Sequence, residues 1–116
     1  MWYCDGVTNL AQKRCIPCEG GALPLSREDS EKLLREVSGW ELSVDSRAIS
    51  RQYTFKNFVD AMNFANKITP IAEGEGHHPD LSIGWGKVRV ELTTHAMSGL
   101  SENDFIVAAK INEISA

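Results

Sequence analysis

The stretch LSIGWGKVRVELTTH, from Leu81 to His95, alternates apolar and polar side chains after Gly86. The two alternating sets are Val88, Val90 and Leu92 on one parity, and Arg89, Glu91 and Thr93 on the other. A period of two is typical of a β-strand with one buried face. The stretch therefore predicts a hairpin of strands 81–85 and 87–95 that turns at Gly86.

A second hairpin precedes it in the chain. The segments WELSV (40–44) and AISRQYTF (48–55) read as two strands joined by a turn at Asp45-Ser46. Ile49, Tyr53 and Phe55 share one parity, which only Arg51 interrupts. Four strands in two hairpins favour an antiparallel sheet.

Helical patterns flank both hairpins. Residues 25–40 carry a capping Ser26, an apolar stripe at Leu33, Leu34 and Val37, and a terminating Gly39. Residues 56–74 follow a helical period that we expect Pro70 to kink or end. Residues 100–114 form a helix capped at Ser101, with Phe105, Val107, Ala108, Ile111 and Ile114 as its apolar side. The predicted fold class is α+β, in the order α-β-β-α-β-β-α, with a four-stranded antiparallel sheet and the helices packed on one face.

The composition limits the classes of function that suit this chain. The 116 residues suffice for one core, with 42% hydrophobic and 24% charged side chains and a formal charge of −4. A net negative chain without a basic stripe disfavours binding to nucleic acid or to an anionic membrane. The N-terminal sequence lacks the pattern of a secretory signal, so we expect a cytoplasmic protein, with an organelle as the alternative.

The cysteines all lie near the N-terminus. Residues 1–24 read as an irregular arm that carries Cys4, Cys15 and Cys18, and residues 25–116 as the packed domain. An odd number of cysteines without a pairing framework favours a reducing compartment. Two interpretations stay open for Cys15 and Cys18: incidental thiols on a flexible arm, or part of a zinc site shared between chains.

The segment EGEGHHPD, Glu73 to Asp80, places two adjacent histidines before a proline. Gly86 lies nine residues after His77 and nine before His95. A hairpin that turns at Gly86 therefore brings the three histidines to one end of the sheet, although Pro79 is expected to flare that end. The proline also favours an extended backbone at His78, so the adjacent imidazoles should point in different directions.

Each of these residues also has a purely structural interpretation. A single histidine is often merely solvated, Asp104 suits the capping box of the helix that starts at Ser101, and Glu73 and Glu75 read as solvated charges at a helix end. Adjacent histidines reach one metal ion only awkwardly, so we expect no metal here. Because motifs for nucleophilic catalysis and phosphate binding are missing, the three histidines favour proton transfer on a small neutral or weakly polar molecule.

The run from Glu73 to Phe105 resembles the pterin-4a-carbinolamine dehydratases, also called 4a-hydroxytetrahydrobiopterin dehydratases or dimerisation cofactors of a homeodomain transcription factor. The residues that match the family pattern, in order, are Glu73, His77, His78, Pro79, Trp85, His95 and Asp104. The similarity covers about residues 25 to 115. This sequence departs from the family pattern at Gly76, Asn103 and Pro70.

The resemblance implies a hydro-lyase that dehydrates 4a-hydroxytetrahydropterin to quinonoid dihydropterin in tetrahydrobiopterin recycling, without a metal or other cofactor. Its implied catalytic residues are His77, His78, His95, Asp104 and Glu73. Its implied substrate-binding residues are His77, His78, Pro79, Thr94, His95, Ala96 and Trp85.

The resemblance also implies a homodimer or homotetramer, with the helix at residues 101–115 as a possible interface. Two other functions remain as alternatives: a non-catalytic dimerisation cofactor or transcriptional coactivator, and a pterin-handling protein in molybdopterin metabolism. Loss of 4a-hydroxypterin absorbance in the presence of the protein would separate the enzyme from the coactivator.

Overall fold

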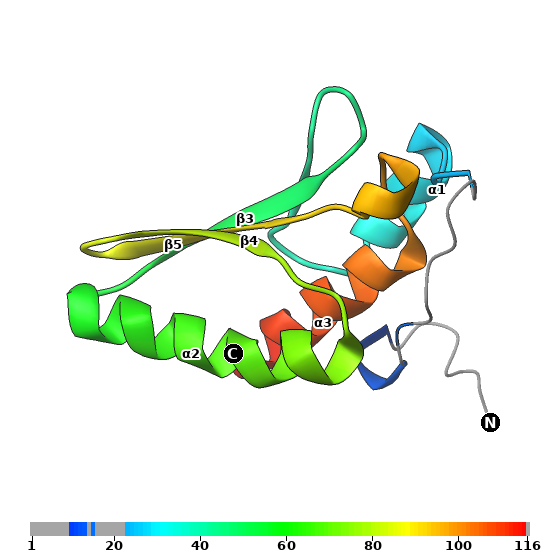
Figure 1. Ribbon diagram of the computed structural model, residues 1–116. Coiled ribbons are helices and arrows are strands. Elements are labelled where there is room, and N and C mark those ends of the chain that lie inside the picture. Colours follow the sequence, from blue (N-terminus) through cyan, green and yellow to red (C-terminus); the bar gives the residue numbers. More distant parts are fainter. Residues whose placement is uncertain (1–9, 14, 16–22, 116) are drawn as a thin grey trace.

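The computed structural model describes residues 10–13, 15 and 23–115, and its centre is a four-stranded antiparallel sheet. Figure 1 shows three of these strands beside the helices. The strands are β2 (Glu41–Leu42), β3 (Ile49–Thr54), β4 (Asp80–Gly84) and β5 (Lys87–Leu92), in the spatial order β2-β3-β5-β4. Gly84 pairs with Lys87, so a two-residue connection of Trp85 and Gly86 joins β4 to β5. The predicted hairpin is therefore confirmed, and β5 lies in the middle of the sheet.

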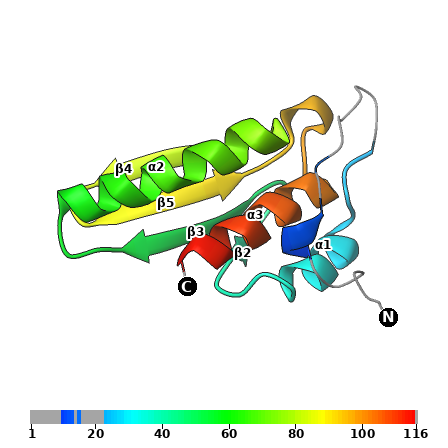
Figure 2. The same cartoon turned by 90° about the horizontal axis from the view of Figure 1, so that it is seen from below.

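The helices cover one face of this sheet (Figure 2). They are α1 (Arg27–Leu34), α2 (Phe58–Glu75) and α3 (Glu102–Ser115), with short 3₁₀ helices η1 (Leu10–Gln12) and η2 (His95–Met97). Ser26 caps α1 by accepting the Asp29 N–H at 3.1 Å, as its sequence predicted. The α+β class and its element order are confirmed. Within the described residues, no helix is long and apolar enough to cross a membrane.

The apolar side chains that alternate along β5 form the centre of the core. Val88, Val90 and Leu92 are fully buried, and the strand lies against α2. The strand ends at Leu92, however, and not at His95 as the alternation predicted. Thr94 instead forms an isolated bridge with Gly99, and the chain between them turns through η2. This turn takes His95 out of the sheet and into a loop beside the start of α3.

Pro70 does not end its helix. The helix α2 continues through it to Glu75, although proline lacks the N–H of the regular bond. Ile68 and Ala72, on either side of the proline, are both buried against the core. Packing of this face stabilises the helix beyond what local propensity allows, because most helical stability in proteins comes from tertiary contacts.

The helix α3 is buried over more of its circumference than its apolar stripe predicted. Residues 103–109 are all buried, including Ile106 and Ala109 outside the predicted stripe. One reason is η1, which lies along α3 and inserts Leu10 into the core (Figure 2). The N-terminal part of the chain thus supplies packing that the central sequence does not reveal.

Cys15 also packs against the core, so the expectation that all three cysteines lie outside the packed domain is wrong for this one. Cys4 and Cys18 lie outside the described residues. The domain boundary between residues 24 and 25 stays a prediction.

Asn112 connects α3 to the β2–β3 side of the sheet. Its side-chain oxygen accepts hydrogen bonds from Trp40 Nε1 at 2.9 Å and Arg51 Nη1 at 2.8 Å. Arg51 also lies over the ring of Tyr53, 4.5 Å from its centroid. These contacts explain why an arginine occupies the apolar parity of β3: its long side chain reaches the edge of the core and bonds there.

Candidate active site

One pocket of about 480 Å³ lies where the end of α2, the loop after β5 and the start of α3 meet. Its lining contains the three histidines together with backbone and side chains of neighbouring loops: Cys15, Glu75, Gly76, His77, His78, Thr93, Thr94, His95, Ala96 and Asn103. The adjacent His77 and His78 therefore line the same pocket as His95, although about 18 residues separate them from it in the sequence. The structure therefore brings the three histidines together at one end of the sheet, as predicted.

His77 is held by a buried carboxylate. Its Nε2 lies 2.6 Å from Oδ1 of Asp104, which is fully buried, whereas the His77 side chain retains 12% exposure. The other oxygen of Asp104 accepts the Thr94 hydroxyl at 2.8 Å and the Ser101 N–H at 3.0 Å. The predicted capping contact and the contact to a histidine therefore coexist in one carboxylate. Because Nε2 contacts Asp104, Nδ1 is the ring nitrogen that lies outside this contact.

His78 pairs with a different carboxylate. Its Nε2 lies 2.6 Å from Oε2 of Glu73, and both side chains are largely exposed. Glu73 and Pro79 do not line the histidine pocket but a smaller neighbouring hollow, which His78 also borders. The left-handed Gly76, with φ of 64°, ends α2 and turns the chain so that the two imidazoles reach different carboxylates.

The third histidine comes from η2. Thr94 precedes this short helix, and Ser98, in the left-handed region with φ of 53°, ends it. His95 and Ala96 are exposed and line the pocket, while Thr94 is buried beneath them. Exposed imidazole above a buried hydrogen-bond network leaves the ring accessible to a small molecule.

Trp85 is located elsewhere. It lies in the β4–β5 connection, is 70% exposed and does not line the histidine pocket. Figure 1 shows that this connection is at the far end of the β4–β5 hairpin from the loop after β5. Its expected contact with substrate is not made within this pocket of a single chain, and that role stays a prediction.

The expectation that Glu75 is a solvated charge at a helix end is wrong. Its side chain is 9% exposed, not solvated, and lines the pocket. Oε1 accepts the Cys15 N–H at 2.7 Å, and Oε2 lies 3.8 Å from Lys110 Nζ. No local signal distinguishes Glu75 from Glu73, because the partners of Glu75 are distant in sequence.

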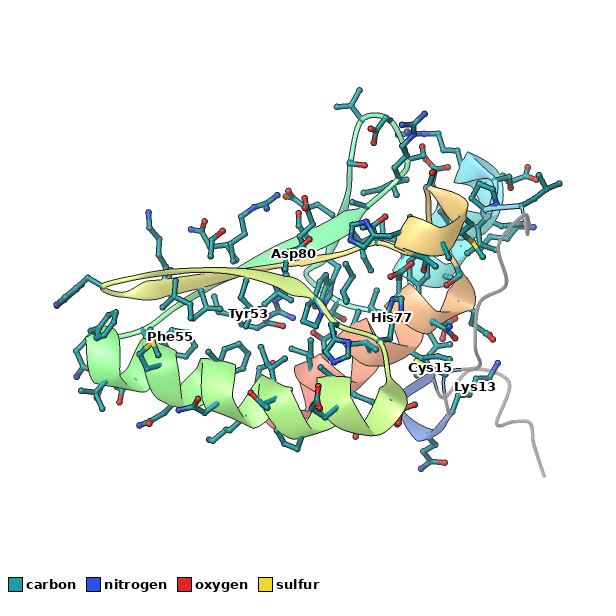
Figure 3. All side chains as sticks on the ribbon, in the orientation of Figure 1. Lys13, Cys15, Tyr53, Phe55, His77 and Asp80 are labelled. Atoms are coloured by element: carbon teal, nitrogen blue, oxygen red, sulfur yellow. The ribbon has the colours of Figure 1, made fainter. Side chains whose placement is uncertain are left out.

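Cys15 was likewise not predicted to belong to the site. It lies near His77 in Figure 3, its Sγ is 3.7 Å from the Asn103 carbonyl oxygen, and it lines the same pocket. Burial, and next the nearby Glu75 carboxylate, raise the pKa of the Cys15 thiol to about 12. The thiol is therefore protonated at neutral pH and offers the pocket a weakly polar wall.

Among residues 10–13, 15 and 23–115, no three His, Cys, Asp or Glu side chains gather in an arrangement that could hold a metal ion. The alternative of a zinc site at Cys15 and Cys18 depends on a residue outside this part of the chain. The expected absence of a metal and of other cofactors remains a prediction.

Comparisons with known proteins identify the family of this chain. The family model described as pterin 4 alpha carbinolamine dehydratase matches residues 23–114. A protein of Methylococcus capsulatus named as a pterin-4-alpha-carbinolamine dehydratase is 50% identical over 93% of this chain and 95% of its own length. A protein of the same name from Halorhodospira halophila is 45% identical over 93% of this chain and 99% of its own.

A solved structure extends the similarity to the fold. The transcriptional coactivator/pterin dehydratase from Brucella melitensis superposes with a TM-score of 0.75 and 32% identity, over 80% of this chain and 99% of that one. The match to the family model covers both hairpins, α1, α2, all but the last residue of α3, and the three histidines. This chain therefore belongs to the family of pterin-4a-carbinolamine dehydratases, which are hydro-lyases.

Proposed function

We propose that this protein dehydrates a 4a-hydroxytetrahydropterin to quinonoid dihydropterin by general acid–base catalysis, as a step in tetrahydrobiopterin recycling. The observation that supports this function best is the single pocket of about 480 Å³ that three histidines line together. Imidazole suits the reaction because its donor and acceptor forms are both available near neutral pH.

The chemistry needs two proton transfers. A ring nitrogen of the pterin uses its electron pair to expel the hydroxyl group from C4a, and the C–O bond breaks. An acid protonates the departing oxygen, so that water leaves, and a base accepts the proton of the ring nitrogen. Atoms and charge balance without a redox step, and the work left to the protein is positioning and proton transfer.

We assign these transfers to His77 and His95, on opposing sides of C4a, and substrate binding with charge stabilisation to His78. Two carboxylates support them: Asp104 orients the His77 ring through its 2.6 Å contact, and Glu73 does the same for His78. Thr94 and Ala96 line the pocket and contribute backbone contacts to the pterin ring. In this proposal the reaction needs no metal ion and no other cofactor.

The test is the decay of 4a-hydroxytetrahydropterin absorbance in stopped-flow measurements. Substitution His95→Ala or His77→Ala should lower kcat by about 100-fold, a typical contribution of one general acid or base. The control is Gln52→Ala, because Gln52 is exposed on β3 and does not line the pocket. Full dehydratase rate in His95→Ala would contradict the assignment, and a wild-type rate equal to the uncatalysed one would contradict the function.

A coactivator role is the second candidate, because the Brucella melitensis relative carries both names. Such a role requires a protein partner and no proton transfer. A wild-type protein that leaves the rate of dehydration unchanged but co-purifies stoichiometrically with a transcription factor would favour it over the enzyme.

We also propose that the chain self-associates as a homodimer or homotetramer. The support is β4, which is an edge strand of the sheet with apolar side chains partly exposed along it: Leu81, Ile83 and, just beyond, Trp85. An exposed apolar edge strand is a ready site for pairing with a second copy.

A further inference from the structure

Part of the N-terminal region forms one wall of the histidine pocket. We call residues 10–13 and 15 the N-terminal segment. Its last residue, Cys15, lines the pocket together with Glu75 and His77; Figure 3 labels Cys15 and His77. The family match begins only at residue 23, so this wall lies outside the part of the chain that the family model describes.

Several contacts hold the N-terminal segment in place, and two of them are made by neighbouring side chains, Lys110 and Glu75. Leu10 inserts into the core, Lys110 donates to the Ala11 carbonyl oxygen at 2.6 Å, and Glu75 accepts the Cys15 N–H at 2.7 Å. Lys110 Nζ also lies 3.8 Å from Glu75 Oε2. Two half-buried side chains, Lys110 from α3 and Glu75 from the end of α2, therefore bind the same short segment.

The burial of Glu75 shows that this contact is more than a surface pairing. A carboxylate with 9% of its side chain exposed is costly unless it is paired and hydrogen-bonded. Among the contacts that offset this cost, the one to the Cys15 N–H is made only while the N-terminal segment is docked. Glu75 is thus connected both to the pocket, which it lines, and to the position of the segment.

We propose that Glu75 is a positioning residue of this active site: it fixes the N-terminal segment as a wall of the pterin pocket, and thereby determines how tightly the pterin binds. This inference rests on the proposed dehydratase function and deepens it. Because Glu75 acts through the wall and not on the reacting atoms, its loss should weaken substrate binding more than it slows proton transfer.

The kinetic test compares three variants with the wild type. Glu75→Gln is nearly isosteric but loses the charge. Lys110→Gln removes the ammonium group that donates to the Ala11 carbonyl oxygen, and Lys110 does not line the pocket. The matched control is Glu102→Gln: Glu102 pairs with Lys13 of the same segment at 2.8 Å, but on the exposed surface and outside the pocket. Exposed pairs of this kind contribute little to stability.

For Glu75→Gln and Lys110→Gln we expect KM for the 4a-hydroxytetrahydropterin to rise about ten-fold, with kcat within about three-fold of wild type. Glu102→Gln should leave both constants within about two-fold. An unchanged KM in Glu75→Gln would overturn the proposal. A rise in KM confined to Glu75→Gln, with Lys110→Gln normal, would also overturn it, because Glu75 would then contact the substrate directly.

A second measurement does not depend on activity. Limited trypsin digestion of the full chain, followed by mass spectrometry, reports cleavage after Lys13 in the N-terminal segment. Glu75→Gln and Lys110→Gln should accelerate this cleavage at least about five-fold, while Glu102→Gln should not, and equal rates in all variants would overturn the positioning role. Inactive wild-type protein with accelerated cleavage in the two variants would instead contradict the proposed function alone.

Discussion

Asp104 illustrates how one residue serves both the fold and the site. It is fully buried and accepts hydrogen bonds from the Thr94 hydroxyl and the Ser101 N–H, while contacting His77 Nε2. Its carboxylate therefore starts α3, closes the loop after β5 and orients an imidazole. Removing the charge should affect stability and activity together.

We predict that Asp104→Asn lowers kcat of the dehydratase at least about ten-fold, because an uncharged amide orients the imidazole less firmly. It should also lower the free energy of unfolding by about 1–3 kcal/mol, since one buried donor loses its acceptor. Stopped-flow kinetics and urea unfolding measure the two effects. Asp80→Asn, at an exposed position of β4, is the control and should change the free energy by less than about 0.5 kcal/mol. Wild-type kcat in Asp104→Asn would contradict the orienting role.

Cys15 predicts a dependence of stability on alkaline pH. Its pKa is raised by burial and by Glu75 to about 12 in the folded protein, above the ordinary value of 9.0. Between these values the unfolded chain loses the thiol proton and the folded chain retains it, so the contribution to stability is complete below pH 9 and is lost as the pH rises toward 12.

The wild type should therefore lose more free energy of unfolding between pH 8 and pH 10.5 than Cys15→Ser does. Urea unfolding at both pH values measures this difference, and the hydroxyl variant corrects for every other group that titrates in that range. Equal losses in the two proteins would show that the Cys15 thiol has an ordinary pKa.

At the scale of elements, the end of α2 determines where the histidines point. Gly76 has a φ of 64°, and a Cβ added there would meet no atom within 4 Å, so only its backbone conformation requires glycine. Gly74 lies inside α2 with equally open surroundings and without a positive φ. These two neighbouring glycines should therefore respond to alanine in opposite directions.

We predict that Gly76→Ala lowers the free energy of unfolding by about 1 kcal/mol, whereas Gly76→Asn, which tolerates the left-handed region, costs less. Gly74→Ala should raise the free energy by up to about 1 kcal/mol, because alanine is the better helix former. Thermal and urea unfolding measure all three. Stabilisation by Gly76→Ala would mean that α2 does not end in a left-handed residue.

At the scale of the whole molecule, one edge of the sheet is suited to pairing with a second copy of the chain. The strand β4 is an edge strand, and Ile83 on it is 38% exposed. We predict that Ile83→Lys shifts the protein from a dimer or tetramer to the monomer in light scattering, because charged side chains block pairing at sheet edges. The control is Val44→Lys, since Val44 is highly exposed in the β2–β3 connection. A monomeric wild type would contradict the prediction.

Local sequence signals predicted most of the fold, and they predicted that the histidines of the site lie together. The alternation around Gly86, the caps at Ser26 and Ser101 and the apolar helical periods specify element type, because each is read between residues two to four apart. The spacing of His77 and His95 about the turn was enough to predict that a hairpin brings them together.

Only the tertiary structure decided the rest. Glu75 and Glu73 look alike in the sequence, yet one side chain is 9% exposed and the other 70% exposed. The continuation of α2 past Pro70 and the burial of Cys15 likewise come from packing against distant elements. The physical reason is that burial is a property of the folded whole: the Cys15 N–H that bonds Glu75 is sixty residues away along the chain, so no local pattern can report it.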